Sequence, residues 1–449
     1  MSGEVADLDW RGAAGSLLVT GARVFDPRTG IDETRDVVVR DGRIAELAAA
    51  GKGEVPEGGE RIEADGMVAM PAFFDPHVHL RHVGQSHKEE IETGTRAAAA
   101  GGYCGVVAMA NTEPPTDEPE IVAAMREEAS RDAAVPTGFV GTVTVGMRGE
   151  ELTEMAALRD AGAVGFSDDG LPIRSARVMR RALQYQHLVG GNILLHEEDP
   201  ELTGDGVMGE GAVSAELGLA GVPETSESTM ILRDAALCLY ENARAHVQHL
   251  SSRRSVEAIE FAKGQGTPIT AEVTPHHLVL TDEAVRSLDA RFKMNPPLRT
   301  EDDRQALIDA LRSGVVDCIG TDHAPHASHE KEVPFEGALM GVTGLETAFP
   351  VMYTELVEPG VLDLATIVNG LTAGAALFDF ELPQITPDAQ ANIVLVDLEA
   401  EWEAGADGWE SRSSNSCFAG RRLRSRPVMT IIEGAVAYRQ RAFRMEAVS

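Results

Sequence analysis

A pair of closely spaced histidines follows a short apolar stretch in the first fifth of the chain. Residues 67–74 are predicted to form a buried strand, and the motif DPHVHLR (residues 75–81) comes directly after them. Side chains two residues apart on a strand point to the same side, so His77 and His79 can direct two imidazoles at one point. This is a metal-ligand geometry, although such a pair also arises by chance in a chain with 13 histidines.

Other polar residues stand at the ends of later apolar stretches. They are Asn111, Asp168 with Asp169, His196, His249 and Asp322. Any one of them alone would be interpreted as a hydrogen-bonded residue at a strand end. Several imidazoles and carboxylates that converge on one place are better explained as ligands. Histidine nitrogen and carboxylate oxygen without a thiolate suit Zn2+ or a similar divalent ion, with an open position for water.

The middle of the chain, residues 69–382, alternates short apolar strands with helical stretches. The predicted strands are 68–79, 105–111, 137–143, 163–169, 192–197, 245–251, 269–276 and 315–322. The helical patterns between them are 118–131, 151–161, 176–188, 227–242, 255–264 and 301–313. This alternation predicts an α/β fold, a (β/α)8 TIM-type barrel whose chemistry lies at the C-terminal ends of the strands. The polar residues at the strand ends would then meet at one mouth.

Both ends of the chain carry short alternating strands that need a partner sheet. Asp41-Gly42 and Glu433-Gly434 are hairpin signals within them. The simplest interpretation is one small β-sandwich domain built from both chain ends, residues 1–68 and 383–449, around a barrel of residues 69–382. The acidic, serine-rich residues 399–416 are predicted to form a surface loop.

Composition excludes several classes of function. A formal net charge of -33 argues against a nucleic-acid partner, which needs clustered basic residues. No apolar run approaches the ~20 residues of a membrane span, and the first residues, MSGEVADLDW, are acidic, unlike a signal peptide. We therefore expect a soluble, cytoplasmic protein without a membrane partner. The four scattered cysteines are expected to be reduced structural thiols.

The basic residues are mostly arginine. Lysine occurs only at positions 52, 88, 263, 293 and 331. An acid-rich, lysine-poor composition indicates adaptation to salt, and a GC-rich genome would also favour arginine over lysine.

Several motifs together resemble the amidohydrolase superfamily, and specifically type I dihydroorotases. They are the H-x-H strand, SDDG (167–170), the strand-end His196 and His249, TDHAPH (321–326), NT (111–112), NPPLR (295–299) and GVTGLE (341–346). The H-x-H and TDHAPH motifs also fit hydantoinases, dihydropyrimidinases and allantoinases. The HLR sequence at the second histidine and the DDG turn are more specific for dihydroorotases. The resemblance covers nearly the whole chain.

The resemblance implies a metal centre of one or two Zn2+ ions, or of another divalent metal. Many relatives bridge two metals with a carboxylated lysine after the fourth strand, but no lysine lies between Lys88 and Lys263 here. The bacterial dihydroorotase branch has an aspartate instead, which aligns with Asp169, while Asp168 would face away or contact a ligand without binding the metal. The implied ligands are His77, His79 and Asp322 for one metal and His196 and His249 for a second, with Asp169 between them.

The implied reaction is the reversible cyclisation of N-carbamoyl-L-aspartate to L-dihydroorotate in de novo pyrimidine biosynthesis. A metal supplies a nucleophile at neutral pH by lowering the pKa of bound water to ~7, and it acts as a Lewis acid. By resemblance Asp322 is also the proton shuttle. The planar fork of Arg81 suits the substrate carboxylate, unless it forms a surface salt bridge with Glu89 or Glu90. The resemblance adds, as substrate-binding residues, His79, Asn111, Asn295, His326, Met340 and Gly341.

Two alternatives remain open at this stage. One is another cyclic amidohydrolase, and the other is a non-catalytic dihydroorotase-like scaffold. The presence of a ligand residue at every matched position argues against the scaffold. The sequence departs from the family at His82-Val83-Gly84, where an acidic residue, proline and glycine are usual, so the shape of that loop is open. A homo-oligomer and an association with aspartate transcarbamoylase are compatible with the resemblance.

Overall fold

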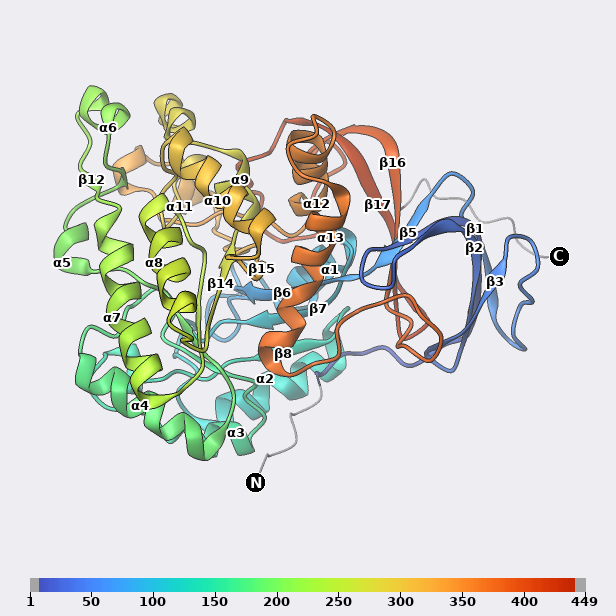
Figure 1. Ribbon diagram of the computed structural model, residues 1–449, viewed down its shortest axis with the longest axis horizontal. Coiled ribbons are helices and arrows are strands. Elements are labelled where there is room, and N and C mark those ends of the chain that lie inside the picture. Colours follow the sequence, from blue (N-terminus) through green and yellow to red (C-terminus); the bar gives the residue numbers. More distant parts are fainter. Residues whose placement is uncertain (1–7, 441–449) are drawn as a thin grey trace.

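The computed structural model describes residues 8–440, in which the middle of the chain and its two ends form separate sheets (Figure 1). Residues 1–7 and 441–449, the outermost parts of the two predicted sandwich segments, lie outside the described residues. In Figure 1 the barrel strands are surrounded by helices, and β1, β2 and β3 lie to one side of them.

The middle of the chain forms a barrel of parallel strands. The strands are β6 (Phe73–Val78), β7 (Tyr103–Ala108), β8 (Thr137–Phe139), β9 (Phe166–Ser167), β10 (Ile193–Leu195), β13 (Ala245–Val247), β14 (Ile269–Val273) and β15 (Cys318–Ile319). They form two parallel sheets, β6-β7-β8 and β9-β10-β13-β14-β15. Isolated bridges from Gly141 to Phe166 and from Val78 to His323 join these sheets along both edges. The ring is therefore closed, and the predicted barrel is confirmed.

Helices connect the strands and cover the outside of the barrel. The longer ones are α1 (Ile91–Gly101), α2 (Pro119–Asp132), α4 (Ala176–Val189), α7 (Thr225–Glu241), α8 (Arg253–Gly264), α10 (Glu301–Ser313) and α13 (Leu364–Ala373). The shorter ones are α3 (Met155–Asp160), α5 (Pro200–Thr203), α6 (Ala212–Leu217), α9 (Pro275–Val279), α11 (Ser328–Lys331) and α12 (Ala348–Met352). Helix α10 has the bounds that the sequence predicts, because Thr300 and Asp303 form a capping box and Gly314 ends it in the left-handed region.

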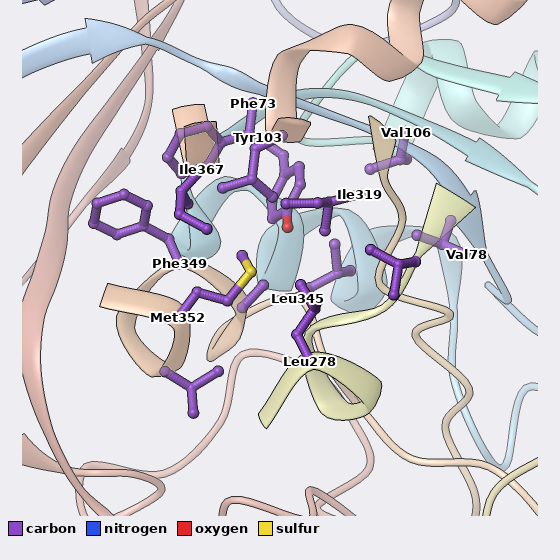
Figure 2. Close-up of a cluster of buried hydrophobic side chains, with 14 of the residues drawn as sticks. Phe73, Val78, Tyr103, Val106, Leu278, Ile319, Leu345, Phe349, Met352 and Ile367 are labelled. Carbon is purple, nitrogen blue, oxygen red and sulfur yellow. The ribbon is translucent and has the colours of Figure 1, made fainter. Parts of the chain in front are cut away.

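An aromatic cluster holds strand β6, which carries His77 and leads directly to His79. Figure 2 shows Phe73 and Tyr103 beside Phe349, among aliphatic side chains. The rings of Phe73 and Phe349 are stacked with centroids 5.3 Å apart, and Phe73 meets Tyr103 edge-on at 5.6 Å. Rings of this size bury a large apolar area, so they fix β6 against β7 and α12.

Strands from both chain ends form one continuous sheet that folds into a sandwich. Its order is β18-β17-β16-β5-β1-β2-β3, and β4 also pairs with β1. The strands are β1 (Leu17–Asp26), β2 (Ile31–Arg40), β3 (Arg43–Ala49), β4 (Glu60–Glu63), β5 (Val68–Pro71), β16 (Ile393–Glu403), β17 (Arg422–Ile432) and β18 (Ala435–Arg439). Between its layers lies a separate apolar core with members such as Val19, Val37, Ile393 and Ile431.

Both predicted hairpin turns are confirmed. Asp41 and Gly42 have φ values of 47° and 81°, and Glu433 and Gly434 have φ values of 47° and 73°. Two consecutive residues with positive φ match the turn whose twist suits the flanking strands, and Gly adopts this conformation without steric cost.

The predicted strand 68–79 is in fact two strands in different sheets. Strand β5 pairs with β16 and β1 of the sandwich, whereas β6 pairs with β7 of the barrel. The chain therefore passes from one sheet to the other at Ala72. The predicted domain limits themselves remain a prediction.

The prediction of a surface loop at residues 399–416 holds for the exposed residues 406–408 and is wrong for the two ends of the segment. Strand β16 continues to Glu403, and Ser411, Ser413 and Asn415 are at most 6% exposed. We call residues 410–415 the mouth segment, because they run along the loops at the mouth of the barrel. Their hydroxyl and amide groups hydrogen bond to those loops, so a polar composition is compatible with burial here.

Two smaller expectations concern cysteine and membranes. The four cysteines are all buried and free, as expected of structural thiols. Within residues 8–440, no helix is long and apolar enough to span a bilayer.

Candidate active site

The predicted metal ligands come together at the carboxyl ends of five barrel strands. His77 lies in β6 and His79 directly after it, and the other ligands follow β9, β10, β13 and β15. Their exposed fractions are 0% for His77, 5% for His79, 3% for Asp169, 6% for His196, 3% for His249 and 6% for Asp322. The barrel thus collects in one buried place residues that are up to 245 positions apart in the sequence.

His77, His79 and Asp322 form a first group of donor atoms. The Nε2 atom of His79 lies 2.9 Å from Asp322 Oδ1, and Nε2 of His77 lies 3.5 Å from the same oxygen. One ligand atom of each residue lies within 4.8 Å of the other two, close enough for one ion to contact all three. Burial opposes charge on Asp322, but the neighbouring His77 and His79 lower its pKa to about 2.

Asp169 stands between this group and a second one. Its Oδ2 lies 3.7 Å from His77 Nε2 and 3.4 Å from His79 Nε2. Its Oδ1 lies 3.5 Å from Nδ1 of His196 and 3.8 Å from Nε2 of His249. These two ring nitrogens are themselves 3.0 Å apart. The two carboxylate oxygens therefore face two different pairs of histidines.

The donor atoms fit a divalent cation. His77 Nε2 and Asp169 Oδ1 are buried and have no hydrogen-bond partner in the described part of the chain. Such unpaired groups are costly in an interior, and a cation placed among them would satisfy both. Burial alone would raise the pKa of Asp169, but His196, His249 and His77 lower it well below its usual range, so it stays ionised. Nitrogen and oxygen donors without sulfur suit zinc and several other divalent metals.

The two adjacent aspartates point in different directions. Asp168 Oδ1 accepts hydrogen bonds from the backbone N–H groups of Val143 and Thr144, at 2.8 and 3.0 Å, and Oδ2 accepts one from the Thr144 hydroxyl. This carboxylate therefore ties the loop after β8 to the loop after β9. Only Asp169 faces the histidines.

Arg81 has the position that the sequence suggests, beside the donor groups. Its Nε donates to the carbonyl of Pro325 at 3.2 Å, which leaves the two terminal nitrogens without a hydrogen-bond partner among residues 8–440. The alternative salt bridge with Glu89 or Glu90 does not form. Glu89 accepts hydrogen bonds from Ser411 and Thr93, and Glu90 pairs with Arg412.

Two predicted substrate-binding asparagines contact residues of the site in this structure. Asn111 Oδ1 lies 2.8 Å from His79 Nδ1, and its Nδ2 lies 3.4 Å from Asp169 Oδ2. Asn295 donates to Glu198 Oε2 at 2.7 Å and lies 3.3 Å from His196 Nε2. Both amides therefore border the metal ligands.

His326, Met340 and Gly341 meet on one side of the mouth. His326 Nε2 lies 2.7 Å from the carbonyl oxygen of Met340. Gly341 has a φ of 129°, and a Cβ there would lie 2.9 Å from the Cβ of Ala324, so only glycine fits. Its N–H donates to the Lys293 carbonyl at 3.0 Å, so this group is already engaged within the protein.

Two glutamates that sequence reasoning missed contact histidines of the predicted ligand set. Glu272 Oε1 lies 2.6 Å from His77 Nδ1, and its Oε2 lies 3.2 Å from His246 Nε2. Glu198 Oε2 lies 3.0 Å from His196 Nε2. A carboxylate on the second ring nitrogen of a ligand fixes its tautomer and orientation. The available signal was an acidic residue inside the apolar strand β14.

The loop at residues 82–84, which departs from the family pattern, is held in place by contacts with residues that follow β7. Glu113 donates its backbone N–H to the carbonyl of Val83 at 3.0 Å, and His82 Nε2 lies 3.0 Å from Glu128. Gly84 has a φ of 86°, and a Cβ there would lie 1.8 Å from the Glu113 carbonyl oxygen. A glycine is therefore required at this position.

Comparisons with known proteins agree with this geometry. A family model described as dihydro-orotase-like matches residues 66–255. A dihydroorotase of Geobacter metallireducens is 42% identical over 95% of this chain and 100% of its own length. One of Anaeromyxobacter dehalogenans is 42% identical over 94% of this chain and 98% of its own length.

Solved structures show the same fold along nearly the whole chain. The L-hydantoinase (dihydropyrimidinase) from Arthrobacter aurescens superposes with a TM-score of 0.83 at 25% identity, covering 94% of this chain and 96% of that one. A dihydropyrimidinase from Brevibacillus agri superposes with a TM-score of 0.81 at 21% identity, covering 95% of both chains, and is similar in fold alone.

Proposed function

Because the chain belongs to the dihydroorotase family, we propose that its barrel mouth catalyses the reversible, metal-dependent cyclisation of N-carbamoyl-L-aspartate to L-dihydroorotate in pyrimidine biosynthesis. The observation that carries the proposal is the shared carboxylate: Asp169 directs one oxygen at His77 and His79 and the other at His196 and His249. Arg81, whose terminal nitrogens have no hydrogen-bond partner among residues 8–440, lies beside this centre.

The proposed metal is zinc, as one ion held by His77, His79 and Asp322, or as two ions with His196 and His249 on the second. Asp169 would contact both positions. When bound, such an ion polarises the amide carbonyl and lowers the pKa of water to ~7. The contacts of Glu272 to His77 and of Glu198 to His196 would hold the rings in the ligating orientation.

Asp322 is the proposed proton shuttle. Its pKa of about 2 keeps it ionised at neutral pH, so it can accept a proton from the attacking water. In hydrolysis it then gives that proton to the ring nitrogen as the amide bond breaks. In cyclisation the same residue removes the proton from the attacking nitrogen and gives it to the carboxyl oxygen that departs as water. Asp322 Oδ1 lies 2.9 Å from His79 Nε2, so this carboxylate faces the donor atoms of the proposed metal centre.

Arg81 is the proposed partner of the substrate carboxylate. A guanidinium fork and a carboxylate form two parallel charge-assisted hydrogen bonds, which fix the orientation of the ring as well as its binding. Asn111 and Asn295, at the rim of the ligands, would contact the substrate together with His326 and the Met340–Gly341 backbone. In this proposal His79 serves both as ligand and as part of the substrate pocket.

A second candidate is a cyclic amidohydrolase for rings without a carboxylate, such as hydantoin, dihydropyrimidine or allantoin. The similarity to the L-hydantoinase structure at 25% identity favours it. Arg81 favours dihydroorotate, because the terminal nitrogens of this partly buried guanidinium would gain no charged acceptor from an uncharged ring. The complete donor groups disfavour a non-catalytic scaffold.

The test is a side-by-side assay of the metal-loaded enzyme. We expect N-carbamoyl-L-aspartate cyclisation that a chelator abolishes and added zinc restores, with weak or no hydantoin hydrolysis. The matched control is Asp322→Asn, which should lose several orders of magnitude in kcat while its circular dichroism spectrum is unchanged. Preference of the wild type for hydantoin would replace the dihydroorotase proposal by the second candidate.

The proposal extends to a cytoplasmic enzyme that forms homo-oligomers and associates with aspartate transcarbamoylase. Light scattering of the purified protein tests the first association. Mixing it with the transcarbamoylase in the same measurement tests the second.

A further inference from the structure

The mouth segment brings residues of the C-terminal part of the chain into the barrel loops. Ser413 donates to the carbonyl of Lys88 at 2.6 Å, and the backbone N–H of Arg412 donates to Glu89 Oε1 at 3.1 Å. The hydroxyl of Ser411 also donates to Glu89. Because all these bonds are made by residues that lie after the barrel in the sequence, the mouth is completed only when both parts have folded.

Asn415, at the end of the mouth segment, joins two loops with its side-chain amide. Its Oδ1 accepts the backbone N–H of His326 at 3.1 Å. Its Nδ2 donates to the carbonyl oxygens of Ala324 and Gly341, at 3.2 and 3.1 Å. The residue is 6% exposed, so these bonds are made in an interior where each lost partner is costly.

The same contacts lead to Arg81 through one peptide group. The peptide between Pro325 and His326 gives its N–H to Asn415, and its carbonyl oxygen accepts the Arg81 Nε at 3.2 Å. Asn415 therefore holds one side of the peptide plane while Arg81 binds the other. A rotation of that plane would move the guanidinium.

The proton shuttle is held by other contacts. Thr321, directly before Asp322, donates its N–H and its hydroxyl to Asp75 at 3.1 and 2.6 Å. Asp322 Oδ1 itself lies 2.9 Å from His79 Nε2, among the proposed metal ligands. A change at Asn415 should therefore affect the substrate-binding side of the mouth and leave the catalytic carboxylate in place.

Resting on the proposed function, we propose that Asn415 is a positioning residue for the substrate carboxylate. Its amide holds the Pro325–His326 peptide in the plane that aims Arg81, and it fixes the distance from His326 to the Met340–Gly341 backbone. Binding of the acid then depends on a residue of the C-terminal segment that has no contact with the metal ligands.

The direct test compares Asn415→Asp with Asn415→Ala. The aspartate has the same shape and keeps an acceptor for the His326 N–H. Its second carboxylate oxygen replaces the Nδ2 donor, so it repels the carbonyl oxygens of Ala324 and Gly341. We expect KM for dihydroorotate to rise about tenfold with kcat within about threefold, the effect of one or two lost hydrogen bonds on binding alone. Zinc content should be unchanged. The alanine variant, which introduces no charge, gives the same measurement if the aspartate variant does not fold.

The matched control is Asn392→Asp in the sandwich. Asn392 Oδ1 also accepts a backbone N–H, that of Glu433 at 3.0 Å, but it lies far from the mouth, beside the start of β6. KM should stay at the wild-type value in this variant. Equal effects of the two substitutions, an unchanged KM in both Asn415 variants, or a joint loss of zinc and kcat would each overturn the proposal.

A second readout does not depend on activity. Hydrogen–deuterium exchange should accelerate in peptides that cover residues 323–331 and 338–345 of Asn415→Ala, because the amide of His326 loses its acceptor. Unchanged exchange there overturns the proposal. If instead the wild type does not act on dihydroorotate, the proposed function is wrong, while accelerated exchange would still show that Asn415 holds the two loops together.

Discussion

At the scale of single residues, the two neighbouring aspartates show how position decides role. Asp168 and Asp169 have the same side chain, but β9 ends so that one carboxylate meets backbone N–H groups and the other meets histidines. The first satisfies donors of the loop after β8 and therefore supports the fold. The second is ionised and only partly satisfied, which is the state expected of a metal ligand.

Alanine substitutions should separate these two roles. Asp169→Ala should lower the zinc content of the purified protein more than Asp168→Ala does, as measured by inductively coupled plasma mass spectrometry. Asp168→Ala should instead lower the melting temperature, because two buried N–H groups lose their acceptor at a cost of about 1–3 kcal/mol each. The opposite ranking of zinc content would assign the ligand to Asp168.

The proposed role of Arg81 is to distinguish substrates with a carboxylate from substrates without one. Dihydroorotate carries a carboxylate that hydantoin and dihydrouracil lack, and a hydrogen bond to a charged group is worth roughly 1.5–3 kcal/mol. Arg81→Met should therefore lose at least about tenfold in kcat/KM for dihydroorotate with unchanged zinc content. Any weak activity on uncharged rings should survive, which serves as the internal control. Equal loss on both kinds of ring would mean that Arg81 supports the metal site.

At the scale of elements, the strands and helices with local signals were predictable. The turn at Asp41-Gly42 and the capped helix α10 follow from residues adjacent in the sequence. The positions of the candidate ligands were predictable for a related reason, because a polar residue at the end of an apolar strand is visible without knowing its neighbours. The barrel then brings these ends together whatever the intervening helices contain.

Segments that are held by contacts with residues far away in the sequence were not predictable in the same way. Residues 410–415 are polar, and only contacts with distant loops, such as those to Glu89 and His326, explain why three of them are buried: Ser411, Ser413 and Asn415. Glu272 likewise contacts His77, which lies 195 positions away in the sequence. A pattern-based prediction assigns polar residues to the surface, so it fails where a fold satisfies them inside.

Glu346 fixes the mouth segment and should make its stability depend on pH. Its carboxylate accepts the backbone N–H groups of Glu410 and Ser411, and burial raises its pKa to about 7 from the ordinary 4.5. The folded state therefore binds more protons than the unfolded state between these two values. The stability gained from this proton is present at low pH and is lost as the pH rises through 7.

Glu346→Gln should remove this dependence while keeping an acceptor oxygen for both N–H groups. The difference in melting temperature, variant minus wild type, should rise from about pH 5 to about pH 8. Other titrating groups are common to both proteins, so their effects cancel in the difference. A constant or shrinking difference in the scanning calorimetry series would contradict the assignment.

At the scale of the whole molecule, the sandwich and the barrel share buried surface. The core cluster that contains Phe73 and Phe349 also contains Val394 and Ile432 from the sandwich strands. Thr430 of β17 donates its hydroxyl to the carbonyl of Ala99 in α1 at 2.6 Å. We therefore expect the two parts to unfold together, since separating them would expose apolar side chains of both.

The net charge acts on this whole structure. The chain has 72 acidic and 39 basic residues, which gives a formal charge of -33, so carboxylates repel one another across the compact state. Many arginines form exposed ion pairs, such as Arg23 with Asp32, but each of these is worth only about 0–1 kcal/mol. Added salt weakens both the repulsion between carboxylates and the attraction within the ion pairs. The repulsion is the larger effect, because nearly half of the acidic groups have no basic counterpart.

The melting temperature should therefore rise as KCl is added from low concentration. The Debye length falls from ~10 Å at 0.1 M to ~3 Å at 1 M, so repulsion between neighbouring carboxylates is progressively screened. A parallel series in NaCl separates screening, which both salts provide equally, from specific binding of potassium. A flat or falling melting temperature would contradict salt adaptation and leave base composition of the genome as the reason why arginine replaces lysine. A rise in both salts would mean that the acidic surface requires salt for full stability.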